Sequence, residues 1–216
     1  MMIQVIDTKT NNLSNVLRAL SACKLEFEVI YSAAELRSGS VVVLPGVGAF
    51  ASCMTSLNDA GFSLALKTHL TRGGKLLGIC VGMQAMARFS TEFGQHAGLG
   101  LIDAKVEHLA DSSNAPIITP NVNWLPLQSE HGRFAEFNGA QVYFVHSYHM
   151  CQFKDPTLIA GTVNYEGLSV CAIVDQGTVI GFQFHPEKSG EVGLHILAHS
   201  ISLLQNTEPM PLSHTA

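Results

Sequence analysis

A cysteine between two glycines is the feature of this sequence that most clearly predicts chemistry. Cys80 lies in the run GICVG at 78–82, after a strand-like segment and before a segment of helical character. In such a run the nucleophile occupies a strained turn at the end of a strand, where side chains at the flanking glycines would clash. The helix N-terminus that follows would stabilise the thiolate, and the Val81 amide would donate to an oxyanion. The context therefore favours a nucleophile over the buried structural cysteine that a lone cysteine usually is.

A cysteine nucleophile needs a base, and the run QFHPE at 183–187 supplies one. His185 and Glu187 are two residues apart, so an extended backbone places both side chains on one side. Pro186 favours that extended backbone at His185. His185 would accept the thiol proton and donate it to the leaving group, while Glu187 would orient the imidazole and stabilise the imidazolium. Among ten histidines, most of which we expect to be ordinary loop or core residues, this one is predicted to be catalytic.

A glycine turn at 45–48, PGVG, is the candidate for a second oxyanion donor. It follows a strand-like segment, and adjacent strand ends meet over one crevice in a doubly wound sheet. This turn is therefore the expected source of a second donor to the oxyanion, although a plain turn after a strand would show the same spacing. The other cysteines have no such context and are assigned to packing: Cys23, Cys53, Cys151 and Cys171.

The first half of the chain alternates apolar, β-branched segments with segments of helical period. Expected strands span residues 3–7, 27–31, 41–44 and 75–79, and expected helices span 12–23, 33–37 and 52–70. Asn12 is the expected N-cap of the first helix. Strands that are apolar on both faces belong in a parallel sheet covered by helices. The pattern predicts an open α/β fold with a mostly parallel central sheet flanked by helices.

The second half is richer in closely spaced strands. Expected strands span residues 101–109, 121–127, 141–148, 158–165, 168–174 and 179–184, and a helix spans about 191–204. The turn Asp175-Gln176-Gly177 joins two of them as a hairpin, which predicts additional antiparallel strands in this half. Without repeats or a linker, residues 1–205 are expected to form one domain, and residues 206–216 a frayed tail.

The composition excludes several classes of protein. Of the 216 residues, 47% are apolar and 13% are charged, which excludes intrinsic disorder. A net charge of −5 argues against nucleic-acid binding, and no apolar window is long enough for a membrane span. The N-terminus lacks a signal peptide and five cysteines do not form a disulfide framework, so we expect a cytoplasmic protein. A surface so poor in charge suggests that one face is covered by a partner.

Four motifs give the sequence a family resemblance: LPGVGAF at 44–50, GICVGMQ at 78–84, YFVHSY at 143–148 and GFQFHPEKSGEVG at 181–193. The sequence resembles the class I glutamine amidotransferases. Within them it is most similar to the glutaminase subunits of imidazole glycerol phosphate synthases, of histidine biosynthesis. The resemblance covers residues 3 to about 204 and implies a flavodoxin-like domain.

The resemblance implies a reaction and a substrate. Cys80, His185 and Glu187 match the family's triad, in which the thiol attacks the side-chain amide of L-glutamine and releases ammonia. Water then hydrolyses the glutamyl thioester to glutamate, and neither a metal nor a cofactor is expected. The family positions that hold glutamine match Gln84, His146, Ser147 and Tyr148, and the loop that completes the oxyanion hole matches Val47 and Gly48.

The resemblance also implies a partner. In the family it is a (β/α)8-barrel cyclase, which receives the ammonia and makes imidazole glycerol phosphate and AICAR. Interface positions match Asn12, Trp124 and Lys188, so a heterodimer is expected.

Two stretches near that expected interface depart from the family pattern. Residues 8–12 read TKTNN, where the family has a tyrosine and two glycines. Residues 120–125 read PNVNWL, where the tryptophan remains but the family's histidine, glycine and asparagine around it are replaced. The acceptor of the ammonia therefore stays open, and the alternative is a paralogous glutaminase that serves amidation of a surface-polysaccharide sugar precursor. The intact triad argues against a non-catalytic regulatory subunit. The sequence also fits a Cys-His peptidase poorly, because the His-Pro-Glu run lies so near the C-terminus and is preceded by the HSY run at 146–148.

Overall fold

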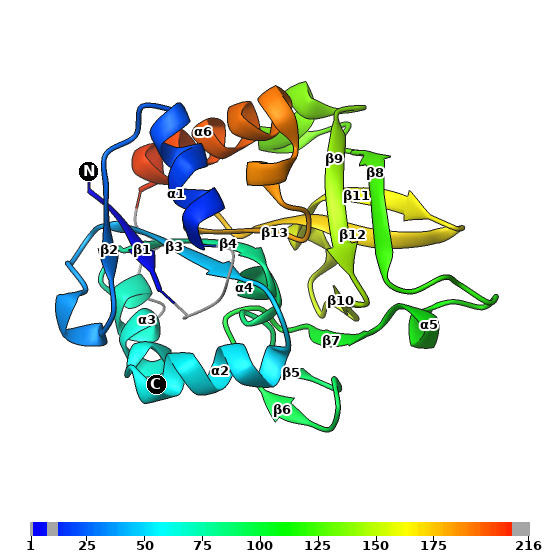
Figure 1. Cartoon of the computed structure of the whole chain (residues 1–216), viewed down its shortest axis with the longest axis horizontal. Coiled ribbons are helices and arrows are strands. Elements are labelled where there is room, and N and C mark those ends of the chain that lie inside the picture. Colours follow the sequence, from blue (N-terminus) through cyan, green and yellow to red (C-terminus); the bar gives the residue numbers. More distant parts are fainter. Residues whose placement is uncertain (1, 8–12, 209–216) are drawn as a thin grey trace.

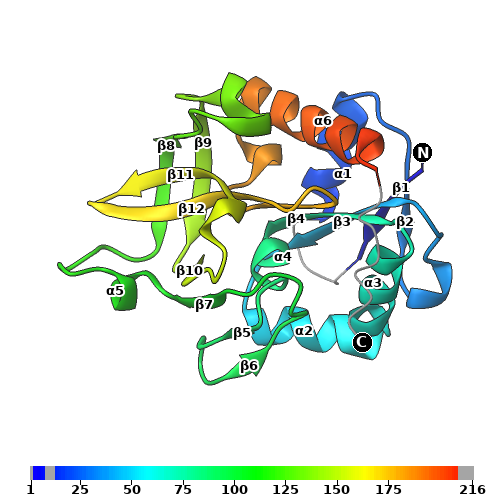
Figure 2. The ribbon, with the colours of Figure 1, turned by 180° about the vertical axis from the view of Figure 1, so that it is seen from behind.

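The computed structural model describes residues 2–7 and 13–208. They form a seven-stranded sheet with helices on both faces, joined to a group of smaller strands on one side (Figures 1 and 2). The expected N-cap Asn12 and the divergent stretch at 8–12 lie outside the described residues, as do residues 209–216 of the expected tail.

The central sheet has the strand order β11-β12-β13-β4-β3-β1-β2. Five of these strands run parallel: β1 (Ile3–Ile6), β2 (Phe27–Ile30), β3 (Val41–Gly46), β4 (Lys75–Cys80) and β13 (Val179–Phe182). Their order, with β1 between β2 and β3, is that of flavodoxin-like folds. Two further strands, β12 (Leu168–Asp175) and β11 (Ile159–Tyr165), extend the sheet by antiparallel pairing. The predicted α/β fold with a mostly parallel sheet is confirmed.

Helices cover both faces of this sheet. Figure 1 shows α1 (Leu13–Ala22) and α6 (Gly190–Asn206) on one face, and α2 (Phe50–Asp59) and α3 (Phe62–Thr71) on the other. Every residue of β1, β3, β4 and β13 is buried, which explains why these strands read as continuous apolar runs.

The helix expected over 52–70 is in fact two helices, so that prediction is wrong. Gly61, with φ +75°, separates α2 from α3, and its N–H donates to the carbonyl of Asn58. Glycine reaches this left-handed conformation without steric cost and commonly ends a helix in this way. The short helix expected over 33–37 is a single 3₁₀ turn, Ala33–Glu35.

The strand expected over 141–148 is divided at Ser147 between two sheets. Its first part, β9 (Gln141–His146), pairs with β8 (Asn121–Pro126). The second part, β10 (Tyr148–Cys151), pairs with β7 (Lys105–His108). The sheet containing β10 also holds two short strands that the sequence did not predict, β5 (Phe89–Ser90) and β6 (His96–Ala97). The strand expected over 101–109 is reduced to β7, after which α5 (Leu109–Ser112) begins.

The hairpin predicted at Asp175-Gln176-Gly177 joins β12 and β13. Asp175 accepts from the Gly177 N–H, and Gly177 has φ +80°. Beyond it, α6 continues through Asn206, and Arg133 donates to the hydroxyl of Thr207, so the first residues of the expected tail are held. The domain boundary at 205 stays a prediction. Three 3₁₀ segments complete the described part of the second half: Gly132–Phe137, Pro156–Leu158 and Pro186–Lys188. In the described ranges we find no helix with the length and apolarity required to cross a bilayer.

Candidate active site

Strand register brings the predicted motifs together at the carboxyl edge of the central sheet. The β3–β4 register pairs Gly46 with Cys80, so the PGVG turn begins beside the nucleophile. On the other side of β4, Phe182 pairs with Ile79, and the chain leaves β13 towards His185 at the same edge. Residues that are far apart in the sequence therefore converge at one site, as the parallel pattern predicted.

Cys80 occupies the strained turn that the flanking glycines predicted. Its φ of +53° and ψ of −110° are unusual for a residue with a side chain. A Cβ added to Gly82 would lie 1.9 Å from the carbonyl oxygen of Leu44, and one added to Gly78 would lie 2.7 Å from the carbonyl of Gly82. Gly82 is therefore required where the chain passes β3, and Gly78 is required where the residues after the turn fold back over β4.

The helix after this turn is shorter than the sequence suggested. It is α4 (Val81–Gln84), a single turn, so few peptide dipoles are aligned behind the thiolate. The stabilising charge must come mainly from His185. Val81 remains well placed as an oxyanion donor, because the first amides of a helix have no acceptor within it.

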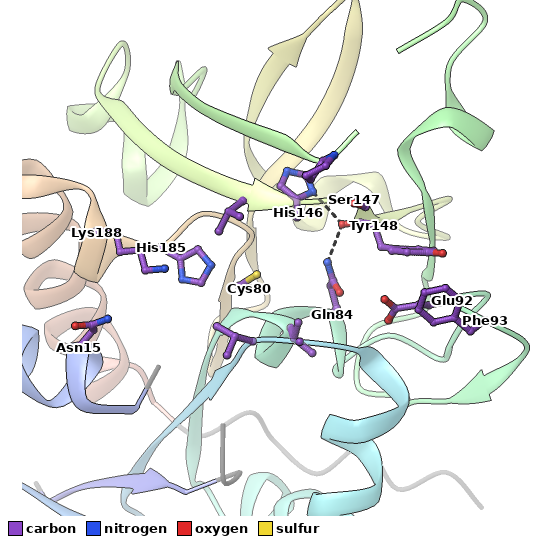
Figure 3. A pocket seen from close by; sticks show the side chains of 15 residues that line it. Asn15, Cys80, Gln84, Glu92, Phe93, His146, Ser147, Tyr148, His185 and Lys188 are labelled. Atoms are coloured by element: carbon purple, nitrogen blue, oxygen red, sulfur yellow. Dashed lines mark hydrogen bonds between the residues drawn. The ribbon is translucent and has the colours of Figure 1, made fainter. Parts of the chain in front are cut away.

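His185 lies beside Cys80 in the pocket (Figure 3) and also contacts a buried carboxylate. Its Nδ1 is 2.7 Å from Oε1 of Glu187, and both side chains are fully buried. Since a carboxylate accepts, Nδ1 carries the proton, and Nε2 makes no geometric hydrogen bond within the described residues. Burial lowers the pKa of His185, but the negative charges of Cys80 and Glu187 and the hydrogen bond to Glu187 outweigh it and raise the pKa to about 10. The imidazolium form of His185 is therefore favoured beside the Cys80 thiol.

The backbone of His185 is fixed by β9. Its N–H donates to the carbonyl of Tyr143 at 2.9 Å. Its carbonyl accepts from the hydroxyl of Ser189, which itself accepts from the N–H of Tyr143. Ser189 belongs to the HPEKS run, but the sequence analysis gave it no role.

A cavity of about 580 Å³ opens above Cys80 and accommodates a molecule the size of glutamine. The predicted residues that line it are Val47, Gly48, Cys80, Val81, Gln84, His146, Ser147, Tyr148, His185 and Lys188. Glu187 lies behind His185 and does not line the cavity. The structure thus gathers the predicted triad, oxyanion and substrate positions around one pocket.

A network of amides connects the pocket wall to the nucleophile. Gln84 Nε2 donates to the carbonyl of Tyr148 at 2.8 Å and to Oε1 of Gln183 at 3.0 Å. Gln183 in turn donates to the Cys80 sulfur at 3.7 Å. The sequence analysis did not assign Gln183, although it belongs to the recognised run QFHPE; the strand expected over 179–184 ends at Phe182, so Gln183 lies in the bend after it.

His146 supports the pocket wall instead of offering a nitrogen to a ligand. Its Nδ1 lies 2.9 Å from the Tyr148 carbonyl oxygen, and its Nε2 lies 3.1 Å from the amide nitrogen of Asn121. Burial lowers the pKa of His146 to about 3, so the ring is neutral at physiological pH. Nδ1–H then donates to the carbonyl while Nε2 accepts from the amide, which engages both nitrogens.

Glu92 is a pocket residue that no motif indicated. It is nearly buried, and its Oε2 accepts from the N–H of Phe50, the first residue of α2, at 2.6 Å. Among the described residues that line the cavity, it is the only acidic one. Glu92 is a single carboxylate in the loop after the two-residue strand β5, and no motif includes it. Its position in the pocket could therefore not be predicted from the sequence.

Comparison with known proteins agrees with this geometry. The family model described as glutamine amidotransferase class-I matches residues 4–202. The chain belongs to this family. It is 38% identical to a Herpetosiphon aurantiacus protein named imidazole glycerol phosphate synthase subunit HisH, over 94% of each chain. A protein of the same name from Lactiplantibacillus plantarum is 38% identical over 91% of this chain and 93% of its own length.

Solved structures support the class I glutamine amidotransferase fold. A crystal structure of a glutamine amidotransferase superposes with a TM-score of 0.71 at 18% identity, covering 93% of this chain and 98% of its own. The structure of PurLQS from Thermotoga maritima gives 0.70 at 15% identity, covering 95% and 97%. At such identities the likeness concerns the fold alone.

An exposed aromatic group stands beside the pocket of this amidotransferase. Trp124 is 52% exposed, and its ring centroid lies 5.7 Å from that of Tyr143. Lys188, which lines the pocket, places its Nζ 5.9 Å from the centre of the same Tyr143 ring. Two of the three predicted interface residues therefore approach the same Tyr143 ring, and the third, Asn12, lies outside the described residues.

Proposed function

We propose that this chain is the glutaminase subunit of an imidazole glycerol phosphate synthase, which hydrolyses L-glutamine to glutamate and supplies the ammonia to a synthase partner. The observation that carries the proposal is the buried His185–Glu187 pair beside Cys80, on a strained turn and under a cavity that fits glutamine. The relatives that bear this subunit name support the histidine pathway over the glycan alternative.

The reaction begins from the thiolate–imidazolium pair. The Cys80 sulfur attacks the side-chain carbonyl carbon of glutamine, and the carbonyl electrons move to oxygen. The N–H of Val81 and the turn at Val47 and Gly48 are the proposed donors to that oxyanion. When the tetrahedral intermediate collapses, His185 gives its Nε2 proton to the departing nitrogen, and ammonia leaves behind a γ-glutamyl thioester.

Hydrolysis of the thioester reverses these roles. His185, now neutral, takes a proton from water, and the resulting hydroxide attacks the thioester carbonyl. Collapse of the second tetrahedral intermediate breaks the carbon–sulfur bond, releases glutamate and restores the thiolate beside the imidazolium. Glu187 keeps Nδ1 protonated throughout, so Nε2 is the nitrogen that exchanges the proton.

The pocket supplies complementary groups for the rest of the substrate. Glu92 offers a carboxylate to the α-ammonium group of glutamine, and Ser147 and Tyr148 line the same pocket. Gln183 donates to the sulfur at 3.7 Å and so orients the nucleophile.

The partner we propose is a (β/α)8-barrel cyclase that covers the pocket mouth. Phe93, which lines the pocket, is exposed, and so are Val122 and Trp124 on β8. Aromatic anchors within an apolar patch are typical of protein interfaces. A barrel seated there would receive the ammonia before it reaches bulk water.

The test is glutamate release by the purified chain, alone and with the cognate barrel and its ligand. We expect release to rise strongly in the complex and to vanish with Cys80→Ala. The gene should also restore growth of a histidine auxotroph that lacks this subunit. Glutamate release that persists with Cys80→Ala would contradict the glutaminase assignment, and failed complementation by an active glutaminase would contradict the histidine pathway.

A further inference from the structure

A second group of chemically reactive side chains lies on the small sheet that contains β10. The antiparallel register pairs His149 with Glu107 and Cys151 with Lys105. Because side chains alternate along a strand, these four project from one face, whereas the pocket residue Tyr148 projects from the other. Donor atoms of Glu107, His149 and Cys151 all lie within 4.8 Å of one another.

The hydrogen bonds around this cluster leave one nitrogen of His149 with a free lone pair. The hydroxyl of Ser112 donates to Oε1 of Glu107 at 2.6 Å, so it must accept from His149 Nε2, 2.8 Å away. Nδ1 then carries no proton. It is buried, without a hydrogen-bond partner in the described part of the chain, and the residue is only 2% exposed. Burial lowers the pKa of His149 to about 4, so the ring stays neutral.

A positively charged side chain, Lys105, already contacts this cluster. The ammonium group of Lys105 forms an ion pair with Glu107, although its side chain is partly exposed and has room to leave. An ammonium group therefore occupies the position beside Glu107 where a metal cation would bind.

We propose that Glu107, His149 and Cys151 bind one divalent cation of the zinc type, held behind the glutamine pocket and independent of the glutaminase chemistry. A thiolate, an imidazole and a carboxylate are the donors that zinc prefers, whereas magnesium and calcium select oxygen alone. On binding, Lys105 leaves Glu107, the Cys151 proton passes to solvent, and water takes the fourth position. Ser112 holds the tautomer of His149, as outer-shell groups do in metal sites.

The geometry needs only small side-chain movements. Since zinc–ligand bonds are about 2.0–2.3 Å, tetrahedral ligands lie roughly 3.3–3.8 Å apart. Donors within 4.8 Å of one another reach that spacing by shifts of about 1 Å, from rotations on two paired strands. The ion would clamp β10 to β7, and β10 carries the Tyr148 carbonyl that Gln84 and His146 contact.

Cobalt is the probe that tests this site, because a thiolate bound to Co²⁺ gives a charge-transfer band in the near ultraviolet. The full chain, without a histidine tag and stripped with a chelator, is titrated with Co²⁺ and then with Zn²⁺. We expect the band to saturate at one equivalent of Co²⁺ and to disappear on addition of one equivalent of Zn²⁺.

Two cysteine variants separate this site from other thiols. Cys151→Ser should abolish the band. Cys80→Ala should retain it, which excludes binding at the catalytic thiol, and Cys23→Ser is the matched control, since Cys23 is also half-buried. A band that is absent from the wild-type chain, or lost in Cys80→Ala and kept in Cys151→Ser, would overturn the proposal.

Two further variants keep the test decisive if Cys151→Ser folds poorly. Ser112→Ala should weaken binding by roughly 10–100-fold, the usual cost of removing an outer-shell partner. Lys105→Ala should tighten it, because the competing ammonium group is gone. Unchanged affinity in both variants would also contradict the site.

Discussion

At the scale of single residues, His185 lies between the Cys80 thiol and the Glu187 carboxylate, and these two groups favour its positively charged form. A fully buried carboxylate fixes the proton on Nδ1, and the thiol faces Nε2. Cys80 and Glu187 together overcome the effect of burial and raise the pKa of His185.

Glu92→Gln tests the proposed recognition of the substrate ammonium. The amide oxygen of the substituted side chain at position 92 could still accept a hydrogen bond from the Phe50 N–H, so we expect the fold to persist. Loss of a charge-assisted hydrogen bond of about 1.5–3 kcal/mol should raise KM for glutamine by roughly 10–150-fold with kcat little changed. Steady-state kinetics measure both values, and thermal unfolding serves as the stability control. An unchanged KM would remove Glu92 from the substrate site.

The triad could be predicted from sequence because its signals are local. Cys80 is marked by its glycines, and His185 and Glu187 by a three-residue run after a strand. Glu92 could not be predicted, because only the folding of a short loop against the start of α2 brings it to the pocket. Gln183 belonged to a recognised run, but its contact with sulfur depends on how β13 packs against β4.

At the scale of elements, the close approach of β3 and the nucleophile turn makes the site possible. Gly82→Ala would place a methyl group 1.9 Å from the Leu44 carbonyl oxygen, and neither backbone can yield cheaply. We expect a loss of stability of more than about 3 kcal/mol, together with loss of activity.

Gly39→Ala is the matched control for that substitution. Gly39 has φ +75° and no atom within 4 Å of an added Cβ, so only backbone strain of about 1–2 kcal/mol is expected. Urea unfolding curves of both variants measure the difference. Equal losses of stability would show that contact with β3 does not constrain the turn.

The parallel half of the fold could be predicted because its buried strands are continuous apolar runs between helical segments. The predicted helix and strand boundaries were wrong where the hydrophobic pattern continues although the chain changes direction. Apolar residues at helical spacing run past Gly61, and strand-like residues run past Ser147. In the second case the backbone switches from one sheet to another without a glycine or proline, so tertiary pairing decides the break.

At the scale of the whole molecule, buried neutral histidines make stability depend on pH. The pKa of His146 is about 3 in the folded chain, against about 6.5 when unfolded, so only the unfolded chain binds this proton between those values. Its contribution is therefore complete above about pH 6.5 and lost as the pH falls, by up to about 1.4 kcal/mol per pH unit.

His146→Gln isolates this contribution. The stability difference between wild type and variant should shrink from about pH 7 to about pH 5, as measured by urea unfolding at each pH. A difference that stays constant over this range would show that His146 does not titrate on unfolding.

Trp124 tests the proposed docking face. Trp124→Ala should weaken association with the barrel by roughly tenfold or more, as loss of a central aromatic anchor does, and leave the isolated chain's stability nearly unchanged. Tyr31→Ala is the matched control, because Tyr31 is similarly exposed and follows β2 at the opposite edge of the central sheet. Calorimetric titration measures both affinities, and equal affinities would place the partner elsewhere.

The central claim is that Cys80 forms a γ-glutamyl thioester, and covalent capture tests it most directly. An electrophilic glutamine analogue is incubated with the complex of this chain and its barrel, and intact and digested protein are analysed by mass spectrometry. We predict one adduct per chain, located on Cys80, absent from Cys80→Ala and prevented by excess glutamine. A complex that releases glutamate yet carries no adduct on Cys80, or carries it on another residue, would contradict the account.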